Sequence, residues 1–313
     1  MRVGIVGAGL SGLAAARELI AGGHEVVVIE KSRGVGGRLA ARRIAGTVVD
    51  HGAPLLEFSH GSPLAELVRS LAPDEVVQMG PGAIAFPSGA TRLAKLMAHG
   101  VDVVLGVRIA ALRAARGGIE LAGEQGNTHG VVDAVVISAP APQAADLLQR
   151  SPEAGDRVAA LRGAVYDPAV MILAGLRIDT PESLDPFAPI APFTRITAES
   201  AKGRDPVDGV VPVVARLTPG VSADLLEAAD ADILAHLSPQ LLASCGATGE
   251  PAWAQVKRWR YATLPASIDQ RVVNPDGARI VVCGDTIAAG GLADVYESGL
   301  AVARSLVGGA STR

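Results

Sequence analysis

Aromatic residues, cysteine and charge of either sign are all scarce in this chain of 313 residues. Phe, Trp and Tyr together make up 3%, and only two cysteines occur, Cys245 and Cys283. Two cysteines so far apart exclude a disulfide scaffold, a CxxC redox pair and a multi-cysteine zinc site. The 28 basic and 32 acidic residues give a formal net charge of −4 without a basic run. Nucleic acids and anionic membranes therefore have no electrostatic reason to bind.

Long uninterrupted apolar runs are absent as well. Glycine, proline or a charged residue interrupts every apolar stretch before it reaches the roughly 18 residues of a membrane-spanning helix. With 49% hydrophobic and 19% charged residues, the chain is too apolar for a disordered segment. The six histidines show no metal-ligand spacing, so we expect no metal site. These observations predict a folded cytoplasmic protein that binds neither nucleic acid nor a membrane.

The first 30 residues carry a strand–turn–helix–strand pattern that is rich in glycine. Residues 1–6 and 26–29 are short apolar runs that predict buried parallel strands, with a helix between them. Gly7 allows a tight turn, Gly9 lets a pyrophosphate approach the backbone, and Gly12 lets the helix pack close to the sheet. The free N–H groups at the start of the helix can then bind the phosphates.

An acidic residue ends the second strand of this pattern. Glu30 follows Gly12 by 18 positions, where a carboxylate can accept hydrogen bonds from ribose hydroxyls. Its negative charge also opposes a 2′-phosphate at the same place. Together these features predict a bound dinucleotide. The alternative is an ordinary glycine-rich turn in a doubly wound fold.

A second glycine motif lies just downstream of Glu30. Gly36-Gly37-Arg38 follows that residue by six to eight positions and resembles the second fingerprint of the flavin amine-oxidase superfamily. The resemblance implies that the glycine doublet brings backbone N–H groups to the pyrophosphate of FAD, and that Arg38 supplies a charged fork. NAD enzymes do not need this element, so non-covalent FAD is the expected cofactor. The alternative is a solvated glycine-rich loop with an unrelated arginine.

The C-terminal part of the chain agrees with an FAD protein. Residues 278–285 predict a buried strand that ends in Gly284-Asp285, and an apolar helix follows at residues 292–307. This order resembles the C-terminal FAD motif of the same superfamily. The resemblance implies that Asp285 binds the ribityl chain or reaches a phosphate. It also implies that the helix N-terminus at Gly291-Leu292 faces the flavin carbonyl O2, where its dipole favours reduced, anionic flavin.

The expected fold class is α/β, with a Rossmann-type FAD-binding domain and an inserted, mixed-sheet substrate domain. We assign residues 1–53, 90–150 and 272–313 to the discontinuous FAD-binding domain, and residues 54–89 and 151–271 to the substrate-facing domain.

Between the motifs, the apolar pattern predicts further elements. It favours a hairpin of residues 100–109 with 119–121, one strand over 131–137, strands at 169–176 and 211–217, and one helix from Ser222 to about Ser244.

Further segments narrow the resemblance to the renalase-like flavoproteins, and the similarity covers nearly the whole chain. The segments that carry it, in order, are Arg42-Arg43, Val49-Asp50-His51-Gly52-Ala53, Phe86-Pro87-Ser88-Gly89, residues 138–144 and Lys257-Arg258-Trp259-Arg260-Tyr261-Ala262. The resemblance implies oxidation of dihydropyridine isomers of NAD(P)H. Hydride would pass to flavin N5, and O2 would take the electrons to give peroxide.

Two positions depart from the renalase-like pattern. Pro54-Leu55 stand where the family tends to have Gln-Tyr, and Val221 stands where a tryptophan is expected. An aromatic side chain that could stack on a substrate ring is thus missing. Trp259 or Tyr261 could supply that stacking instead, because residues at alternate positions of a strand share one face.

The candidate catalytic residues are His51, Trp259 and Tyr261. A purely structural role for His51, and packing between the domains for the other two, remain open alternatives. Val107 is expected, by resemblance, to meet the adenine through its backbone. The predicted cofactor-binding residues are Gly7, Gly9, Leu10, Ser11, Gly12, Glu30, Lys31, Gly36, Gly37, Arg38, Leu39, His51, Gly52, Ala53, Val107, Ala139, Gly284, Asp285, Gly291 and Leu292.

The predicted function is an FAD-dependent oxidoreductase that acts on a small reduced substrate, with a dihydropyridine of NAD(P)H as one candidate and O2 as electron acceptor. One alternative is an FAD-dependent amine oxidase or desaturase. Another is a flavin-binding protein without redox turnover, which the missing aromatic residue motivates. Hydride transfer to a flavin needs orientation and a dry pocket more than an acid–base pair, so the lack of a catalytic dyad does not argue against an enzyme.

Overall fold

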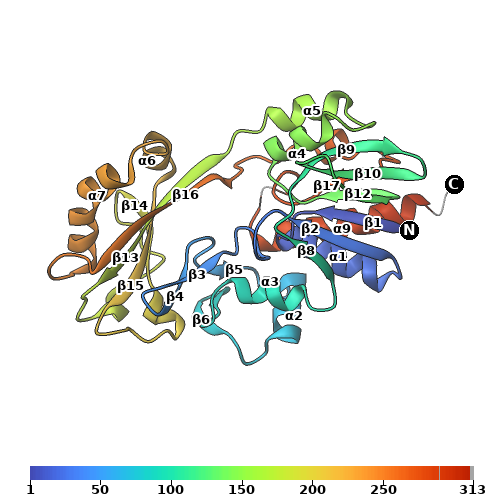
Figure 1. Cartoon of the computed structure of the whole chain (residues 1–313). Helices are drawn as coiled ribbons and strands as arrows, with labels where there is room; N and C mark the ends of the chain where they lie inside the picture. The colour runs from blue at the N-terminus through green and yellow to red at the C-terminus, as the bar shows by residue number, and fades with distance from the viewer. Residues whose placement is uncertain (289, 311–313) are drawn as a thin grey trace.

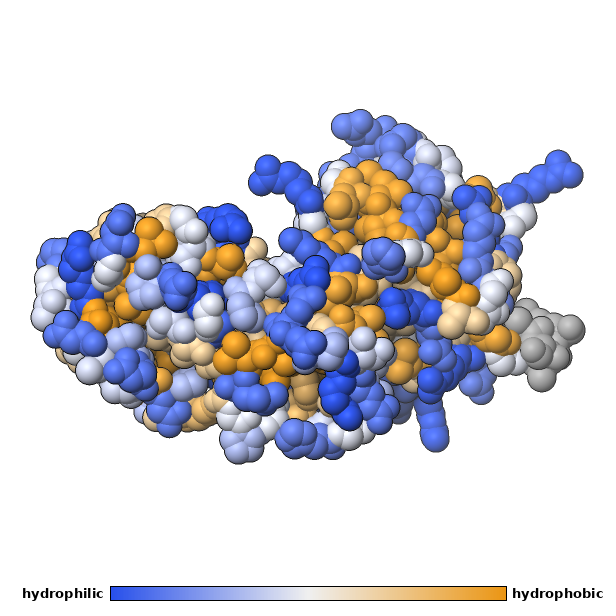
Figure 2. Space-filling view, turned by 90° about the horizontal axis from the view of Figure 1, so that it is seen from below, coloured by the Kyte–Doolittle hydropathy of each residue, from blue (hydrophilic) through white to orange (hydrophobic). Residues whose placement is uncertain are grey.

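The computed structural model describes residues 1–288 and 290–310, which form two lobes. Figure 1 shows one lobe around a parallel sheet that includes the N-terminus, and a second lobe around long strands from residues 167–263. Figure 2, a view from below, shows apolar patches between polar side chains on both lobes. Within the described ranges, no helix has both the length and the hydropathy needed to cross a membrane.

A five-stranded sheet forms the centre of the first lobe. Its strands, in spatial order, are β17 (Ile280–Val282), β12 (Ala134–Ile137), β1 (Arg2–Val6), β2 (Glu25–Glu30) and β8 (Asp102–Leu105). Every neighbouring pair in this order is parallel. Val3 and Ile5 of β1 are completely buried, as expected for a strand that is covered on both faces. The predicted α/β fold with a Rossmann-type sheet is confirmed.

Each face of this sheet has its own apolar core. On one face pack α1 (Leu10–Ala21), α2 (Pro63–Leu71), α3 (Thr91–Met97) and α9 (Leu292–Ala310). The other face is covered by the antiparallel strands β9 (Ile109–Ala115), β10 (Gly118–Gly123) and β11 (Thr128–Val132) and by α4 (Ala141–Leu148), α5 (Gly155–Arg162) and α8 (Gln270–Val273). A Cβ on Gly299 of α9 would lie 2.2 Å from the carbonyl oxygen of Ser11, so α9 and α1 are in close contact.

The second lobe is a four-stranded sheet covered by helices on one face. Its spatial order is β14 (Phe193–Ala198), β15 (Val211–Leu217), β13 (Asp167–Leu176) and β16 (Trp253–Thr263). All three neighbouring pairs are antiparallel, so the predicted mixed sheet is wrong in this respect. An apolar run predicts a strand but not its direction, which tertiary pairing decides.

One predicted helix of this lobe is two helices. The chain forms α6 (Pro219–Asp224), turns over residues 225–229, and then forms α7 (Asp230–Cys245). Thr218 caps α6, and its hydroxyl oxygen accepts from the Val221 N–H. In the turn, the Ala228 carbonyl accepts from the Arg258 guanidinium at 2.5 Å. The 3₁₀ helices η1 (Pro181–Ser183) and η2 (Glu199–Lys202) complete the lobe.

Two strand predictions of the first lobe are also wrong in detail. Residues 100–109 do not form a hairpin with 119–121: β8 pairs with β2 in the parallel sheet, and the hairpin partner of β10 is β9. The run 131–137 is two strands, β11 and β12, which belong to different sheets. Asp133 lies between them, and its carboxylate accepts from the Arg2 N–H at 2.7 Å.

Two small antiparallel units are inserted in the sequence between β2 and β8 of the first lobe. The hairpin of β3 (Ala41–Ile44) and β4 (Thr47–Asp50) precedes the sheet of β5 (Leu56–Glu57), β7 (Ala83–Ala85) and β6 (Val77–Gly80). Leu56, Ile84 and Phe86 share the apolar core of α1. The domain boundaries stay a proposal: the apolar side chains of residues 54–89 share the core of the first lobe, while Glu57, Phe86 and Pro87 also make polar contacts with Arg195 and Arg204 of the second lobe.

Candidate flavin site

The first glycine turn joins β1 to α1, and each of its glycines has a different environment. Gly7 has φ +108°, and a Cβ there would lie 2.4 Å from the Ser138 carbonyl oxygen. A Cβ on Gly12 would lie 2.2 Å from the Gly7 carbonyl oxygen, so both positions need glycine to form the turn. A Cβ on Gly9 would meet only the Ser138 hydroxyl oxygen, at 3.8 Å. The protein's own packing does not require glycine there, which fits the predicted need to leave room for a phosphate.

The N-terminus of α1, which starts at Leu10, faces this turn without a capping side chain. Gly9 is the N-cap residue, and the first turn contains no acidic side chain. The first N–H groups of a helix need an acceptor from outside the helix, and a phosphate is well suited to that place. The turn therefore has the donors that a pyrophosphate needs.

Glu30 connects the two glycine loops. Its side chain is buried, and its two oxygens accept from the Ala8 N–H and the Ser32 N–H, each at 2.8 Å. Gly36, with φ +116°, donates its N–H to the Ala8 carbonyl at 2.8 Å. The doublet loop thus lies directly beside the first turn. Each carboxylate oxygen of Glu30 retains a second lone pair, so binding a ribose hydroxyl remains compatible with this geometry.

Arg38 and Asp285, which come from opposite ends of the chain, form an ion pair. Nη1 of Arg38 lies 2.5 Å from Oδ2 of Asp285, and the same nitrogen donates to the Ala262 carbonyl at 3.1 Å. Burial acts to lower the pKa of Arg38, but the hydrogen bond and charge of Asp285 outweigh it and raise that pKa. No described residue accepts a hydrogen bond from Nε or Nη2 of Arg38. Those groups can therefore donate to a phosphate while Nη1 holds Asp285.

The C-terminal motif meets the first turn from the other side. Gly284 has φ +96°, and its N–H donates to the Ser298 hydroxyl at 2.9 Å. A Cβ on Gly284 would lie 3.2 Å from the hydroxyl oxygen of Ser11, which itself bonds to the Ser138 hydroxyl at 2.9 Å. Gly291 precedes Leu292 at the start of α9, and its N–H donates to Asp294.

The remaining predicted cofactor residues lie around this centre, at varying distances from it. The Val107 N–H donates to the Glu30 carbonyl at 3.0 Å. Lys31 extends to Gln143 at 2.9 Å on the exposed surface. Leu39 is buried in the core of α1, Ala139 packs against the core on the opposite face of the sheet, and Gly37 has φ +54°.

His51 stacks on Trp259, and a hydrogen bond reinforces the contact. The ring centroids are 6.0 Å apart with 14° between the planes, and the indole Nε1–H donates to the His51 carbonyl at 2.5 Å. His51 Nδ1 is buried and has no hydrogen-bond partner among the described residues. Burial, followed by the charges of Lys257 and Arg42, lowers the pKa of His51 to about 4. At neutral pH His51 is therefore an uncharged ring with one free polar atom.

Gly52 and Ala53 connect His51 to the doublet loop. A Cβ on Gly52 would lie 2.0 Å from the Arg38 carbonyl oxygen, and the Ala53 N–H donates to the same oxygen at 2.8 Å. The histidine and the arginine are thereby held on one compact piece of backbone.

Tyr261 contacts a different ring from Trp259. It meets Tyr166 edge-on at 5.3 Å between centroids, while the Tyr166 hydroxyl lies 3.4 Å from Asp285 Oδ1. The register between β13 and β16 shifts between Asp167 and Ala169, so simple alternation does not hold through this part of β16. The expectation that Trp259 and Tyr261 share one face is therefore not supported by the pairing.

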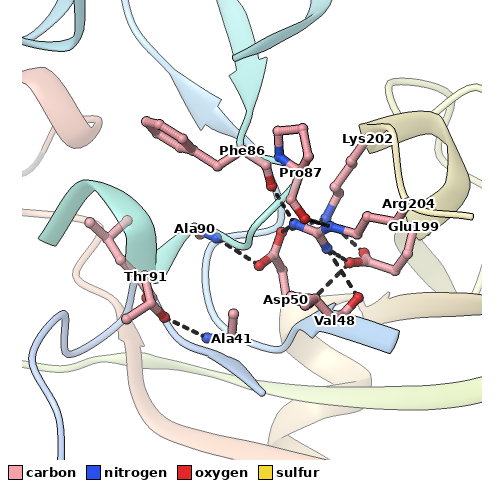
Figure 3. Close-up of polar contacts among 11 residues, drawn as sticks. Ala41, Val48, Asp50, Phe86, Pro87, Ala90, Thr91, Glu199, Lys202 and Arg204 are labelled. Carbon is pink, nitrogen blue, oxygen red and sulfur yellow. Dashed lines mark hydrogen bonds and ion pairs between the residues drawn. The ribbon is translucent and has the colours of Figure 1, made fainter. Parts of the chain in front are cut away.

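A buried group of four charged side chains fixes the residue next to His51 (Figure 3). Asp50 Oδ2 accepts from Lys202 Nζ at 2.9 Å and from Arg204 Nη2 at 2.8 Å. Glu199 accepts from the same two cations, at 2.7 Å from Lys202, and from the Asp50 N–H at 3.1 Å. The four side chains are almost completely buried, and their charges balance. We call them the Asp50 cluster.

Backbone groups complete the Asp50 cluster. Arg204 donates to the carbonyls of Phe86 and Pro87, at 2.7 and 2.9 Å, and the Ala90 N–H donates to Asp50 at 2.9 Å. Two charged side chains on η2 and one on the loop after it thus anchor the end of β4, just before His51 and Gly52. Glu199, Lys202 and Arg204 have no signal in the sequence, because their segment has the composition of a solvated loop and only its folding back onto Asp50 reveals the role.

Comparison with known proteins places the whole arrangement in a family. A profile described as "Flavin containing amine oxidoreductase" matches residues 73–307, and one described as "NAD(P)-binding Rossmann-like domain" matches residues 5–71. The chain belongs to the flavin containing amine oxidoreductase family. FAD is its cofactor, as the flavin-containing family implies.

Individual relatives of this flavin containing amine oxidoreductase match over short stretches. A Mycobacterium tuberculosis protein provisionally named flavin-containing monoamine oxidase AofH is 48% identical over 61 residues, 20% of this chain and 13% of that protein. Polyamine oxidase 1 of Oryza sativa subsp. japonica is 45% identical over 71 residues, 22% of this chain and 14% of that protein. The matches thus span about one seventh of these curated relatives.

The similarity of fold extends over the whole chain. A protein from Exiguobacterium sp. 255-15, provisionally named protoporphyrinogen oxidase, superposes with a TM-score of 0.75 at 15% identity, covering 97% of this chain and 98% of that one. Putrescine oxidase bound to putrescine gives a TM-score of 0.73 at 14% identity, covering 98% and 99%. At such identities these structures establish the fold alone.

Proposed function

We propose that this FAD-dependent oxidoreductase removes a hydride from a small reduced organic substrate and uses O2 as its electron acceptor. The observation that carries the proposal is the Arg38–Asp285 contact, which brings the second and third flavin motifs together beside the first glycine turn. When bound, FAD supplies an N5 atom that accepts the hydride, and O2 then takes the two electrons with two protons to give hydrogen peroxide.

The chain's own residues would bind and orient the cofactor. The uncapped α1 N-terminus and the free nitrogens of Arg38 would donate to the pyrophosphate, and Glu30 would accept from the ribose. Asp285, held by Arg38, would accept from the ribityl hydroxyls. These roles fit the open space at Gly9 and the unused donors of Arg38.

The stacked pair of His51 and Trp259 would form the wall of the substrate site. The indole is fixed by its hydrogen bond to the His51 carbonyl, so it presents a rigid flat surface. A flat substrate ring between this wall and the flavin would be held with its reacting carbon about 3–3.5 Å from flavin N5, the separation of reacting atoms that favours transfer. His51 is neutral, so its ring would orient the substrate by packing rather than by delivering a charge.

A dihydropyridine isomer of NAD(P)H is the substrate that the segments at residues 50–53 and 257–262 suggest, because they resemble the renalase-like enzymes. Oxidation of an amine is the second candidate. The family description and the names of the monoamine and polyamine oxidases support it.

Anaerobic mixing of the purified yellow protein with candidate substrates tests the proposal. The absorbance of oxidised flavin should bleach with the 2- and 6-dihydro isomers of NAD(P)H, and admission of air should restore it with one peroxide per substrate. Bleaching by primary amines or polyamines alone would establish the second candidate. If dithionite were the sole effective reductant, the protein would be a flavin binder without turnover.

A further inference from the structure

A row of basic side chains crosses one face of the four-stranded sheet. Arg195 pairs with Arg216, Arg216 with Met171, and Met171 with Lys257, on four adjacent strands. Directly paired residues of antiparallel strands point to the same face. Three long cations therefore lie along one line, with an apolar methionine in the middle.

This face is the one turned toward the flavin site. Met171 packs in a cluster with Val49 of β4 and with Trp259, which stacks on His51. The neighbouring residues Ile172 and Val256 pack in the core that α7 covers on the opposite face. The basic row thus shares its side of the sheet with the proposed substrate wall.

Two of the three cations, Lys257 and Arg216, have no carboxylate within 4.0 Å among the described residues, whereas the third has one. Arg195 is paired with Glu57 and also lies over the ring of Phe187. Lys257 is half-buried, and its Nζ lies over the ring of Trp259, 4.9 Å from the centroid. In the described part of the chain, no carboxylate lies within 4.0 Å of its ammonium group.

Arg216 is likewise half-buried without an ion pair. Its guanidinium donates to the Thr263 hydroxyl at 3.2 Å, and no carboxylate of residues 1–288 or 290–310 lies within 4.0 Å of it. The carboxylate of Asp167 attracts Arg216 from a longer distance.

Burial, and then neighbouring positive charge, disfavours the charged forms of Lys257 and Arg216. Burial, and then the charge of Arg42, lowers the pKa of Lys257. Burial, and then the charge of Arg195, lowers the pKa of Arg216. Arg42 lies alongside β16, because its guanidinium donates to Gln255 at 2.6 Å. Two unpaired cations are costly inside a protein unless an anion meets them.

We propose that Lys257 and Arg216 form an anion-binding subsite and that the substrate carries a carboxylate or phosphate group held there. Their Cα atoms are two strands apart, about 10 Å, and both side chains are long enough to converge on one anion above Met171. Lys257 and Tyr261, whose carbonyl accepts from Arg38 at 3.5 Å, both lie on β16, with Trp259 between them in sequence. A substrate ring against Trp259 would thus have its anionic group beside Lys257.

The inference rests on the proposed function and narrows its substrate class. An ammonium group placed at this subsite would be repelled by two like charges, so a simple amine is the disfavoured ligand. Burial, followed by the charges of Lys257 and Arg42, lowers the pKa of His51, so its neutral ring adds no further cation to the subsite.

Ligand titration of the FAD-loaded protein tests the subsite without turnover. Four probes share one ring and differ in charge: benzoate, phenyl phosphate, benzylamine and benzyl alcohol. Binding is measured from the flavin spectrum and from tryptophan fluorescence, since the two tryptophans of the chain, Trp253 and Trp259, both lie on β16. The variants are Lys257→Met and Arg216→Met. Arg260→Met is the matched control, because Arg260 is exposed and pairs with Glu227.

At least one of the two anions should bind at least tenfold more tightly than benzylamine and benzyl alcohol. Added NaCl should weaken the binding of that anion. Comparison of benzoate with phenyl phosphate identifies the preferred anionic group. Lys257→Met and Arg216→Met should each raise its Kd by about 10- to 150-fold, whereas Arg260→Met should leave it unchanged.

Equal or tighter binding of benzylamine would overturn the subsite, and so would a Kd that neither Lys257→Met nor Arg216→Met changes. Failure of the proposed function looks different. In that case the anions would bind as expected, but no reduced substrate would bleach the absorbance of the oxidised flavin.

Discussion

Nη1 of Arg38 contacts Oδ2 of Asp285 at 2.5 Å across a sequence separation of 247 residues. The contact closes the flavin site, because Arg38 follows the doublet loop and Asp285 follows the last strand of the parallel sheet. The remaining guanidinium nitrogens have no acceptor among the described residues. The pair can therefore bind an anion without releasing its own carboxylate.

Arg38→Met should weaken FAD binding. The substitution removes a charge-assisted contact worth about 1.5–3 kcal/mol, which corresponds to about a 10- to 150-fold higher Kd. The Kd is measured by fluorescence titration of the deflavinated protein. Arg33→Met, at an exposed position of the same loop, is the control and should bind FAD like the wild type. Retention of full affinity in Arg38→Met would show that the doublet loop does not reach the phosphates.

The Arg38–Asp285 pair should be coupled energetically. Asp285→Asn keeps the shape of the side chain but removes the charge that holds Arg38. In a double-mutant cycle on the unfolding free energy of the FAD-free protein, the two substitutions should be non-additive by about 0.5–3 kcal/mol. Strict additivity would mean that the contact contributes nothing to the fold.

Trp259→Ala should slow flavin reduction and leave FAD bound. Loss of the indole removes the stack on His51 and the hydrogen bond to its carbonyl, so the substrate ring loses a fixed wall. A misplacement of about 1 Å can reduce the rate by up to about 100-fold. Stopped-flow absorbance measures the reduction. Trp253→Ala serves as the control on the same strand, and equal rates in the two variants would remove Trp259 from the substrate wall.

His51 should make the protein less stable as the pH falls from about 6.5 to about 4. Its pKa is lowered to about 4 in the folded state by burial and by Lys257 and Arg42, against 6.5 in the unfolded chain. The unfolded state therefore binds more protons in this window, and the contribution is constant above it. Urea unfolding across pH should show a shallower decline for His51→Asn than for the wild type. The exposed His60→Asn is the control, and a slope identical to that of His51→Asn would contradict the assignment.

Lys202→Met should destabilise the protein strongly. It leaves Asp50 and Glu199 buried with one cation instead of two, and breaking such a buried pair costs about 3–5 kcal/mol. Arg304→Met breaks the exposed pair with Glu18, which water and salt screen, and should change the unfolding midpoint little. Urea unfolding of both FAD-loaded variants gives the comparison. Similar midpoints for the two would show that the Asp50 cluster does not anchor β4.

The sequence alone predicted the elements whose chemistry is local. Gly7, Gly12 and Gly36 stand where a Cβ would clash or where φ is positive, and such positions can be recognised from a glycine spacing beside an apolar run. The buried strands β1, β2 and β17 were predictable for the same reason, because a strand covered on both faces has no polar alternation. FAD as cofactor followed from the order of three such motifs.

Tertiary structure alone decided what depends on distant segments meeting. Strand direction in the second lobe, the sheet change at Asp133 and the break before α7 each depend on a partner far along the chain. The Asp50 cluster needed η2 to fold back onto β4, and the row of Arg216 and Lys257 needed the strand register. A single sequence contains no local signal for such contacts, since the stability of a buried charge depends entirely on which groups surround it.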